Sequence, residues 1–492
     1  MGHACQIAPA KELETSVAMK SRLKKALVIG LSVAAVLVLI LGATLGLFVH
    51  HFNPDPPRAD FPAPADARAA QSQDLTYFKT LMGMDRAFAP AARAEAERRL
   101  SALASADAMP RQKLQAALMQ ILALADNGHT YMGIFHGGEP VQVLPVRATA
   151  FADGIHVLRA KSEYRELLGG RVVSVDGQPI EAVMQKLETL RGGVPGYRRG
   201  KAANYLVVQD LLHGLGISPE AGKSTWTVRL ADGSDTTRTL DSYPLSDGDT
   251  LPDHPRWMSP EPLPGMGAEW AAYAPAGGAL PESLQKPETP FLYEPVGQGC
   301  AAYLRMRAIA DDEGQAIKPF IASTEATLRA HPPCAVILDL RYNRGGNFQN
   351  TYDFMHALPG LVSQQGGIYV LTDAMTFSAA ITTAAFVKQA GGARVKILGE
   401  PVGDRLQFYA EGSGGCLPNS HLCVYYATGE HDYAQPCTDW DRCFWLNWFY
   451  PVRVQSLAPD ELIPARFSDW NAGHDLAYEA AIAMAERSIH PE

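Results

Sequence analysis

The sequence predicts an α/β protein preceded by an apolar N-terminal helix. Three observations predict this fold class: an uncharged apolar run at residues 26–49, helical periodicity between residues 75 and 125, and an alternation of short apolar runs with helical segments after residue 290. Such an alternation is typical of layered α/β structures. The chain has 492 residues, of which 47% are hydrophobic. This composition predicts two or three folded units and excludes a disordered protein.

The apolar run at residues 26–49 is long enough to cross a membrane. A helix of this length measures about 36 Å, and the hydrocarbon core of a bilayer is about 30 Å thick. Residues 1–25 carry five basic and two acidic side chains. The positive-inside rule therefore predicts a cytoplasmic N-terminus and a periplasmic or otherwise extracytoplasmic main body. A cleaved signal peptide is the alternative, but its apolar region is usually only about 7 to 15 residues long. We predict an uncleaved signal anchor in the inner (cytoplasmic) membrane.

The rest of the chain is acidic, with a net charge of −12 beyond residue 49. Binding to phosphate groups requires clustered Lys and Arg, so we expect no nucleic-acid partner.

Six of the seven cysteines lie in the predicted exported body, and an even number suits an oxidising compartment. No C-x-x-C or H-E-x-x-H motif occurs, so we expect disulfides and no metal. Two pairs would close short loops and a third would join neighbouring strands, although spacing alone does not decide the pairing. The candidate pairs are Cys416 with Cys423, Cys437 with Cys443, and Cys300 with Cys334.

Composition also divides the chain into segments. Apolar residues at helical spacing end at Asn127-Gly128, which predicts a left-handed C-terminal cap. Ten of the 35 prolines fall between Pro244 and Pro290, which predicts a long connector. The predicted segments are a cytoplasmic stub at 1–25, the anchor at 26–49, a tether at 50–70, a small helical domain at 71–140, a β-rich module at 141–242, the connector at 243–290 and the α/β core at 291–492.

A serine lies at one of the predicted strand-to-helix junctions. The buried strand 335–340 opens into Gly345-Gly346, and the strand 368–371 leads through a short loop to Ser378 and a helix. A serine in this position lies at the positive end of the helix dipole, beside free backbone amides that can stabilise an oxyanion. The alternative interpretation is an ordinary N-cap serine.

Five segments resemble, in order and spacing, the tail-specific or C-terminal processing serine peptidases of family S41. They read GHTYMGIF, AVILDLRYNRGG, IYVLTDAMTFSAAITTAA, VKILGEPVGD and LAPDELIPARFSDWNAGHDLAYEAAIAMA. The stretch 145–190, which ends in GGRVVSVDGQPIEAVMQKL, is similar to the PDZ-like module of these proteins. The resemblance spans roughly residues 110–487. It implies a crotonase-like α/β core, a peptide or protein substrate and no cofactor.

This resemblance implies that Ser378 is the nucleophile. The Ala379 amide and an amide of Gly345 or Gly346 would form the oxyanion hole. The better-known members activate the serine with a lysine after the GEP segment, but this position falls here on Arg405, or on Asp404 with a one-residue gap. Neither side chain can act as a neutral amine.

Another branch of the family uses a histidine as base, and the GHT segment places His129 at that position. Histidine has an ordinary pKa of about 6.5 and can take the serine proton near neutral pH. Where this branch has an orienting acid, the chain has Arg453, so Asp404 and Glu411 are the remaining candidates for that role.

The sequence therefore predicts an anchored, exported serine peptidase that acts through an acyl-enzyme. The alternative is an inactive S41-fold protein that binds peptides or acts as a scaffold in the cell envelope. Asp153, in the loop where a PDZ domain binds a terminal carboxylate, would repel that group. The aromatic cluster of Trp440, Phe444, Trp445, Trp448, Phe449 and Tyr450 is interpreted as core or interface packing rather than as a substrate-facing rim. The oligomeric state is left open.

Overall fold

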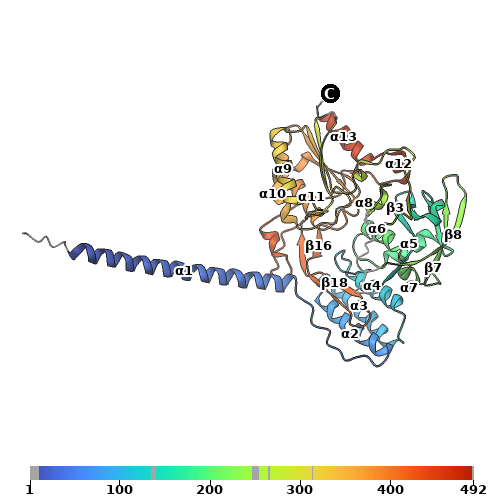
Figure 1. The fold of residues 1–492 in the computed structure, drawn as a ribbon, viewed down its shortest axis with the longest axis horizontal. Helices are drawn as coiled ribbons and strands as arrows, with labels where there is room; N and C mark the ends of the chain where they lie inside the picture. The colour runs from blue at the N-terminus through green and yellow to red at the C-terminus, as the bar shows by residue number, and fades with distance from the viewer. Residues whose placement is uncertain are drawn as a thin grey trace, which may run out of the picture. The chain divides into compact units, whose positions relative to one another are not determined.

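The computed structural model describes residues 10–489 apart from 135–139, 246–253, 264–265, 298 and 313. Parts of the predicted stub, of the GHTYMGIF segment and of the predicted connector lie outside the described residues. The chain divides into two units, residues 1–55 and 56–492 (Figure 1). The first contains helix α1 (Ala10–Phe52). Its stretch Leu27–Phe52 is, among the described residues, the helix long and apolar enough to cross a membrane.

The second unit begins with three helices, α2 (Ala67–Met84), α3 (Pro90–Ser105) and α4 (Arg111–Leu122). Asp66 caps α2 because its carboxylate accepts the Ala69 amide at 2.8 Å. Phe78 on α2 and Leu118 on α4 are fully buried in the same core. The left-handed residue after these helices is Asp126, with φ 49°, so the predicted cap at Asn127-Gly128 is wrong by one residue.

A β-rich part follows, in which the strands are mostly antiparallel. The strands of its main sheet lie in the order β10-β4-β5-β7-β8, and in addition β3 pairs with β4 and β6 pairs with β5. The segment predicted as a connector thus adds an edge strand, β10, to this sheet. The elements are β3 (Val146–Phe151), β4 (Gly154–Lys161), β5 (Arg171–Val175), β6 (Gln178–Pro179), α5 (Ile180–Glu188), α6 (Pro195–Tyr205), α7 (Gln209–Gly214), β7 (Lys223–Arg229), β8 (Asp235–Asp241), α8 (His254–Met258) and β10 (Trp270–Ala272), beside the separate pair β2 (Val141–Val143) and β9 (Tyr243–Leu245).

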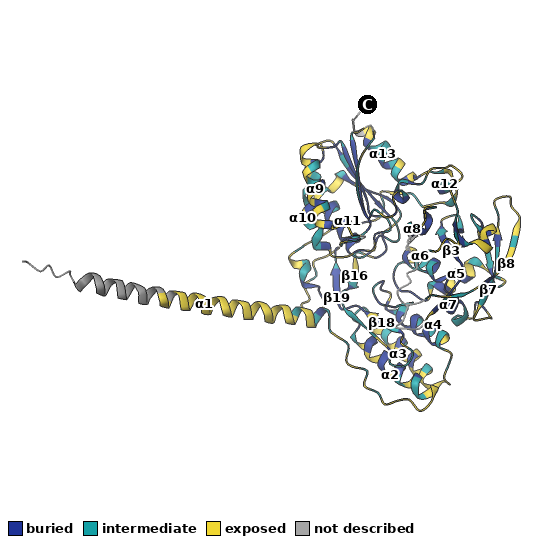
Figure 2. Cartoon of the chain, viewed as in Figure 1, coloured by how far each residue is buried: buried dark blue, intermediate teal, exposed yellow. Residues whose placement is uncertain are grey.

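The last part contains a six-stranded sheet in the order β11-β12-β13-β14-β15-β20. Five of its strands are parallel, namely β12, β13, β14, β15 and β20, whereas β11 pairs with β12 in the antiparallel sense. Helices cover its faces, so β13 is buried at every residue (Figure 2). The elements are β11 (Phe291–Val296), β12 (Ala301–Met306), α9 (Ile317–Ala330), β13 (Ala335–Asp339), α10 (Tyr352–Ala357), β14 (Gly367–Thr372), α11 (Ala379–Gly391), β15 (Val395–Gly399), β20 (Glu461–Leu462), α12 (Phe467–Ala472) and α13 (Leu476–Ile489).

Short strands join these parts, whereas the disulfides all lie within the last part. β1 (Tyr131–Met132), which follows the helices, pairs with β18 (Cys423–Tyr426), which in turn pairs with β17 (Ser413–Cys416). A second small sheet pairs β16 (Gln407–Ala410) with β19 (Gly429–Asp432). The three candidate disulfides are confirmed: Cys300 with Cys334, Cys416 with Cys423 and Cys437 with Cys443. The α/β fold class is also confirmed.

Candidate active site

Ser378 is held in an unusual backbone conformation between β14 and α11. Its φ of 57° and ψ of −128° lie in a region that L-residues rarely adopt, and its side chain makes no capping hydrogen bond to the helix. The interpretation as an ordinary N-cap serine is therefore wrong. The loop before it is fixed, because the Phe377 amide donates to the Asn343 carbonyl at 2.9 Å and the Thr376 hydroxyl to the Leu340 carbonyl at 2.9 Å.

The glycine pair after β13 lies directly against this serine. A Cβ on Gly345 would be 2.6 Å from Ser378 Cβ and 2.9 Å from the Ala379 nitrogen, so only glycine allows this approach. The Gly345 amide itself donates to Asn343 Oδ1 at 2.9 Å. The amides of Ala379 and Gly346 donate to no acceptor in the part of the chain that the structure describes. Of the two glycines considered for the oxyanion hole, Gly346 is therefore the one with an available donor.

The loop that carries His129 is fixed by its neighbours. The Asn127 side chain accepts the Tyr409 amide at 3.2 Å and donates to the Thr130 hydroxyl at 3.1 Å. Arg191 donates to the Gly128 carbonyl at 2.7 Å. These contacts position His129 between the helical part and the α/β core.

The His129 ring stacks on Phe377, the residue that precedes Ser378, with 4.4 Å between ring centroids. Phe408 stacks on it at 5.6 Å. Both ring nitrogens are buried and have no hydrogen-bond partner among the described residues, so no hydrogen bond joins His129 to Ser378. Burial, with smaller contributions from His431 and Arg191, lowers the pKa of His129 from 6.5 to about 3, although the Tyr409 backbone opposes this slightly. The ring is neutral at physiological pH.

Neither candidate acid bonds to His129. Asp404 is buried and accepts the Arg405 amide at 2.9 Å, and burial raises its pKa to about 6. Its second oxygen, Oδ2, has no partner in the described part of the chain. Glu411 faces a different histidine, with 3.4 Å between its Oε1 and His431 Nε2.

The basic residues after the serine point away from it. Lys388 and Lys396 both form ion pairs with Asp460, at 3.3 and 3.1 Å. Arg405 forms an ion pair with Asp126 at 2.6 Å. These contacts agree with the expectation that no lysine is placed to act as base.

Sequence reasoning missed a buried polar chain beside the site. The Thr382 hydroxyl, one turn after Ser378 on α11, is 2.7 Å from the Tyr433 hydroxyl, which is 3.2 Å from His431 Nδ1. The His431 ring stacks on Phe408 at 5.0 Å, so Phe408 separates it from His129. No motif surrounds His431 in the sequence, and only the pairing of β19 with β16 brings it here.

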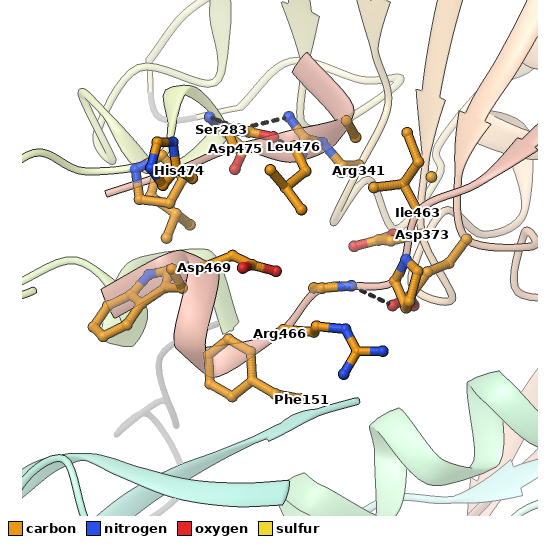
Figure 3. A pocket seen from close by; sticks show the side chains of 18 of the residues that line it. Phe151, Ser283, Arg341, Asp373, Ile463, Arg466, Asp469, His474, Asp475 and Leu476 are labelled. Atoms are coloured by element: carbon orange, nitrogen blue, oxygen red, sulfur yellow. Dashed lines mark hydrogen bonds and ion pairs between the residues drawn. The ribbon is translucent and has the colours of Figure 1, made fainter. Parts of the chain in front are cut away.

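Cavities lie at the carboxyl ends of the parallel strands. One of about 70 Å³ contains Arg341, Asp373 and Asp469 (Figure 3). Asp373 also lines a second cavity, of about 190 Å³. A third cavity has a volume of about 610 Å³, and Glu400 lines all three. Burial raises the pKa of Asp373 to about 7. Ser378 lines none of the three, but they include residues of the loop leading to it. Ligands of open α/β sheets bind at such strand ends.

The loop of Asp153, which we expect to repel a terminal carboxylate, is bonded to another part of the chain itself. Asp153 accepts the amides of Phe467 and Ser468, at 2.7 and 3.1 Å, at the start of α12. The Ala152 amide donates to the Ala465 carbonyl at 2.8 Å. The residues before α12 thus take the place that a bound peptide end would need.

Comparison with known proteins shows the fold. No family model and no curated protein matches the chain. Mature CPAF in complex with lactacystin aligns with a TM-score of 0.57 at 13% identity, over 87% of this chain and 100% of that one. The photosystem II D1 C-terminal processing protease aligns with a TM-score of 0.37 at 13% identity, over 83% of this chain and 98% of that one. A protein described as an S41 protease of Bacteroides fragilis aligns with a TM-score of 0.32 at 13% identity, over 78% of this chain and 92% of that one. The chain thus shares the overall fold of mature CPAF, as a likeness at 13% identity allows.

Proposed function

We propose that the chain is a membrane-anchored, exported serine peptidase of the tail-specific type and a member of the His-using branch of family S41. One observation carries this proposal. Ser378 is held at positive φ with its hydroxyl unused as a cap, against the backbone of Gly345 and beside two available amides. Strained backbone of this kind clusters at active sites.

In the proposed reaction, the Ser378 hydroxyl attacks the peptide carbonyl and His129 takes its proton. The amides of Ala379 and Gly346 bind the oxyanion. His129 then gives the proton to the leaving amine, and water releases the acyl group by the reverse sequence. The low pKa of the buried ring favours this second proton transfer and opposes the first, so the proposal requires the ring to become more basic once substrate is bound. Catalytic hydrogen bonds are often absent before substrate binds, and we expect the bond between Ser378 and His129 to form with the substrate.

The isolation of His129 supports a second function. An S41-fold protein that binds peptides or acts as a scaffold in the cell envelope would need no base, and this ring has no polar partner in the described structure. The two functions differ in whether Ser378 is a nucleophile.

A fluorophosphonate probe separates them, applied to the full chain in detergent. We expect labelling of wild type, none of Ser378→Ala, and strongly reduced labelling of His129→Ala. Ser323→Ala, an exposed serine on α9, is the matched control and should label like wild type. Wild type that neither labels nor cleaves an unstructured protein substrate would favour the binding function. Full labelling of His129→Ala would show that a residue other than His129 acts as the base.

A further inference from the structure

Exposed aromatic side chains gather on one loop of the body. Outside α1, the described residues include six exposed large apolar side chains, and three of them lie within ten residues. Trp440 is 61% exposed, Trp448 39% and Phe449 73%. We call these three residues the aromatic patch. Within the aromatic cluster expected to pack in a core or an interface, Phe444 and Trp445 are buried, whereas these three side chains are exposed.

The loop holds the patch in a fixed arrangement. The disulfide between Cys437 and Cys443 closes its first half. The Trp448 indole N–H donates to the Cys437 carbonyl at 3.0 Å, and the ring lies 5.2 Å from that of Trp440. Because the indole N–H of Trp448 is bonded within the loop, its apolar face is what remains for a partner. The patch is therefore preorganised, and its exposure does not come from a loose chain end.

This loop lies close to the point where the anchor enters the body. Arg86, just after α2, donates to the Asp441 carbonyl at 2.5 Å. Nine residues earlier, in α2, the Tyr77 hydroxyl donates to the Pro57 carbonyl at 2.7 Å. Helix α2 and the residues that directly follow it thus contact both the first residues after the anchor and the loop.

The chain between the anchor and this attachment point is short. Five residue steps separate Phe52, the end of α1, from Pro57, and a fully extended chain of that length spans about 18 Å. If α1 crosses a membrane, Pro57 therefore remains within about 18 Å of the end of the helix. A body held so closely presents its nearby surface to the bilayer.

We propose that the aromatic patch inserts into the interface of the membrane that holds α1, and so fixes the orientation of the body; this rests on the proposed membrane anchoring. Trp and other aromatic side chains favour the headgroup region, where their rings are partly buried in lipid. The three side chains of the patch carry no charge, and Arg442 next to them in the loop is paired with Glu430 at 3.0 Å. Its attachment is therefore apolar and does not depend on anionic lipid.

Tryptophan fluorescence tests this in the intact protein. The seven tryptophans all lie beyond residue 225, so α1 contributes no signal. The full chain is reconstituted in phosphatidylcholine nanodiscs with or without lipids brominated near the headgroup. We expect the brominated lipid to quench the fluorescence, equally at low and high salt. The double variant Trp440→Ser/Trp448→Ser should lose at least about half of the quenching, because interfacial rings are the ones in reach of bromine.

Controls keep the result interpretable. Leu462→Ser removes an exposed apolar side chain elsewhere and should leave quenching unchanged. Phe449→Ser retains all tryptophans and should weaken their quenching if the patch inserts as a unit. Absence of quenching in protein that co-purifies with the discs would overturn the docking proposal and leave the anchor standing. Failure to co-purify would overturn both, but would leave probe labelling of Ser378 unaffected.

Discussion

Replacing His129 by Phe should preserve the fold and change how stability depends on pH. Phe keeps the stacking on Phe377 and Phe408 and removes two buried ring nitrogens that have no partner. A buried polar atom without a partner costs about 1–3 kcal/mol, whereas fitting a slightly larger ring costs about 1 kcal/mol or more. At pH 7.5 we therefore expect the variant to lie within about 1 kcal/mol of wild type. The variant should no longer react with the fluorophosphonate probe.

The pH dependence has a definite sign. The pKa of His129 is about 3 in the folded chain and 6.5 when it is exposed, so the unfolded chain binds more protons between these values. Stability of the wild type therefore falls as pH falls through this window. Between pH 7.5 and 4.5 the loss amounts to roughly 2–3 kcal/mol. The Phe variant does not lose this stability, so between these pH values it should gain roughly 2–3 kcal/mol over wild type.

Urea unfolding of both proteins at the two pH values, followed by circular dichroism, measures this gain. Other titrating groups, including Asp373 and Asp404, occur in both proteins, and their effects cancel in the difference. His331→Gln is the matched control, because His331 is exposed and its replacement should give no such gain. A difference between wild type and His129→Phe that is the same at pH 7.5 and 4.5 would show that the ring is solvated and would refute the reasoning.

Three further predictions follow from the same contacts. Gly345→Ala would place a methyl group 2.6 Å from Ser378 Cβ, so it should abolish labelling. Gly392→Ala has nothing within 4 Å of the new Cβ but shares the positive φ of 55°, so it should cost about 1–3 kcal/mol and keep labelling. Equal labelling of the two variants would contradict the close approach of Gly345 to Ser378. Lys388→Ala removes a partly exposed ion pair with Asp460 and a hydrogen bond to the Val395 carbonyl, so labelling should stay within about twofold of wild type. A large loss would support a lysine base. Asp153→Ala should raise hydrogen exchange at residues 465–470 through loss of two amide acceptors, and unchanged exchange would count against a role of this carboxylate in holding α12.

Much of the α/β core could be predicted because its signals are local. The run Ala335–Leu340 is apolar at every residue apart from Asp339, as a strand buried on both faces requires, and β13 occupies it. Two of the candidate disulfides close short loops, with sequence separations of 7 and 6, whereas Cys300 and Cys334 are 34 residues apart and are paired as neighbours on adjacent strands. Features that depend on contacts between distant residues could not be predicted from the sequence. Asp126, not Asn127-Gly128, is left-handed, because Arg405 binds its carboxylate and its carbonyl at 2.6 and 3.0 Å from 279 residues away.

The residues of the candidate site also differ in whether the sequence alone could predict them. Ser378 could be found from its strand-to-helix junction and the glycine pair, which are neighbours in a known order. The contact of His129 with Phe377 could be found only through the resemblance, because no pattern within a short window links the two segments. His431 could not be found at all, since a single histidine in a strand has no signature. The orientation of Trp440 and Phe449 depends on a disulfide-closed loop whose side chains point outward, and an aromatic composition does not reveal direction.

Ser378 itself offers the test that separates a catalytic serine from a structural one. Its backbone, at φ 57° and ψ −128°, costs a non-glycine residue about 1–3 kcal/mol, and its side chain returns no capping bond. Glycine removes that strain but adds about 1 kcal/mol of chain entropy to the cost of folding. We therefore expect Ser378→Gly to be more stable than Ser378→Ala by up to about 2 kcal/mol in urea unfolding, and at least as stable as wild type, while neither variant is labelled. A serine kept for structure would make both variants clearly less stable than wild type. That result would refute the view that stability is given up here to place a nucleophile.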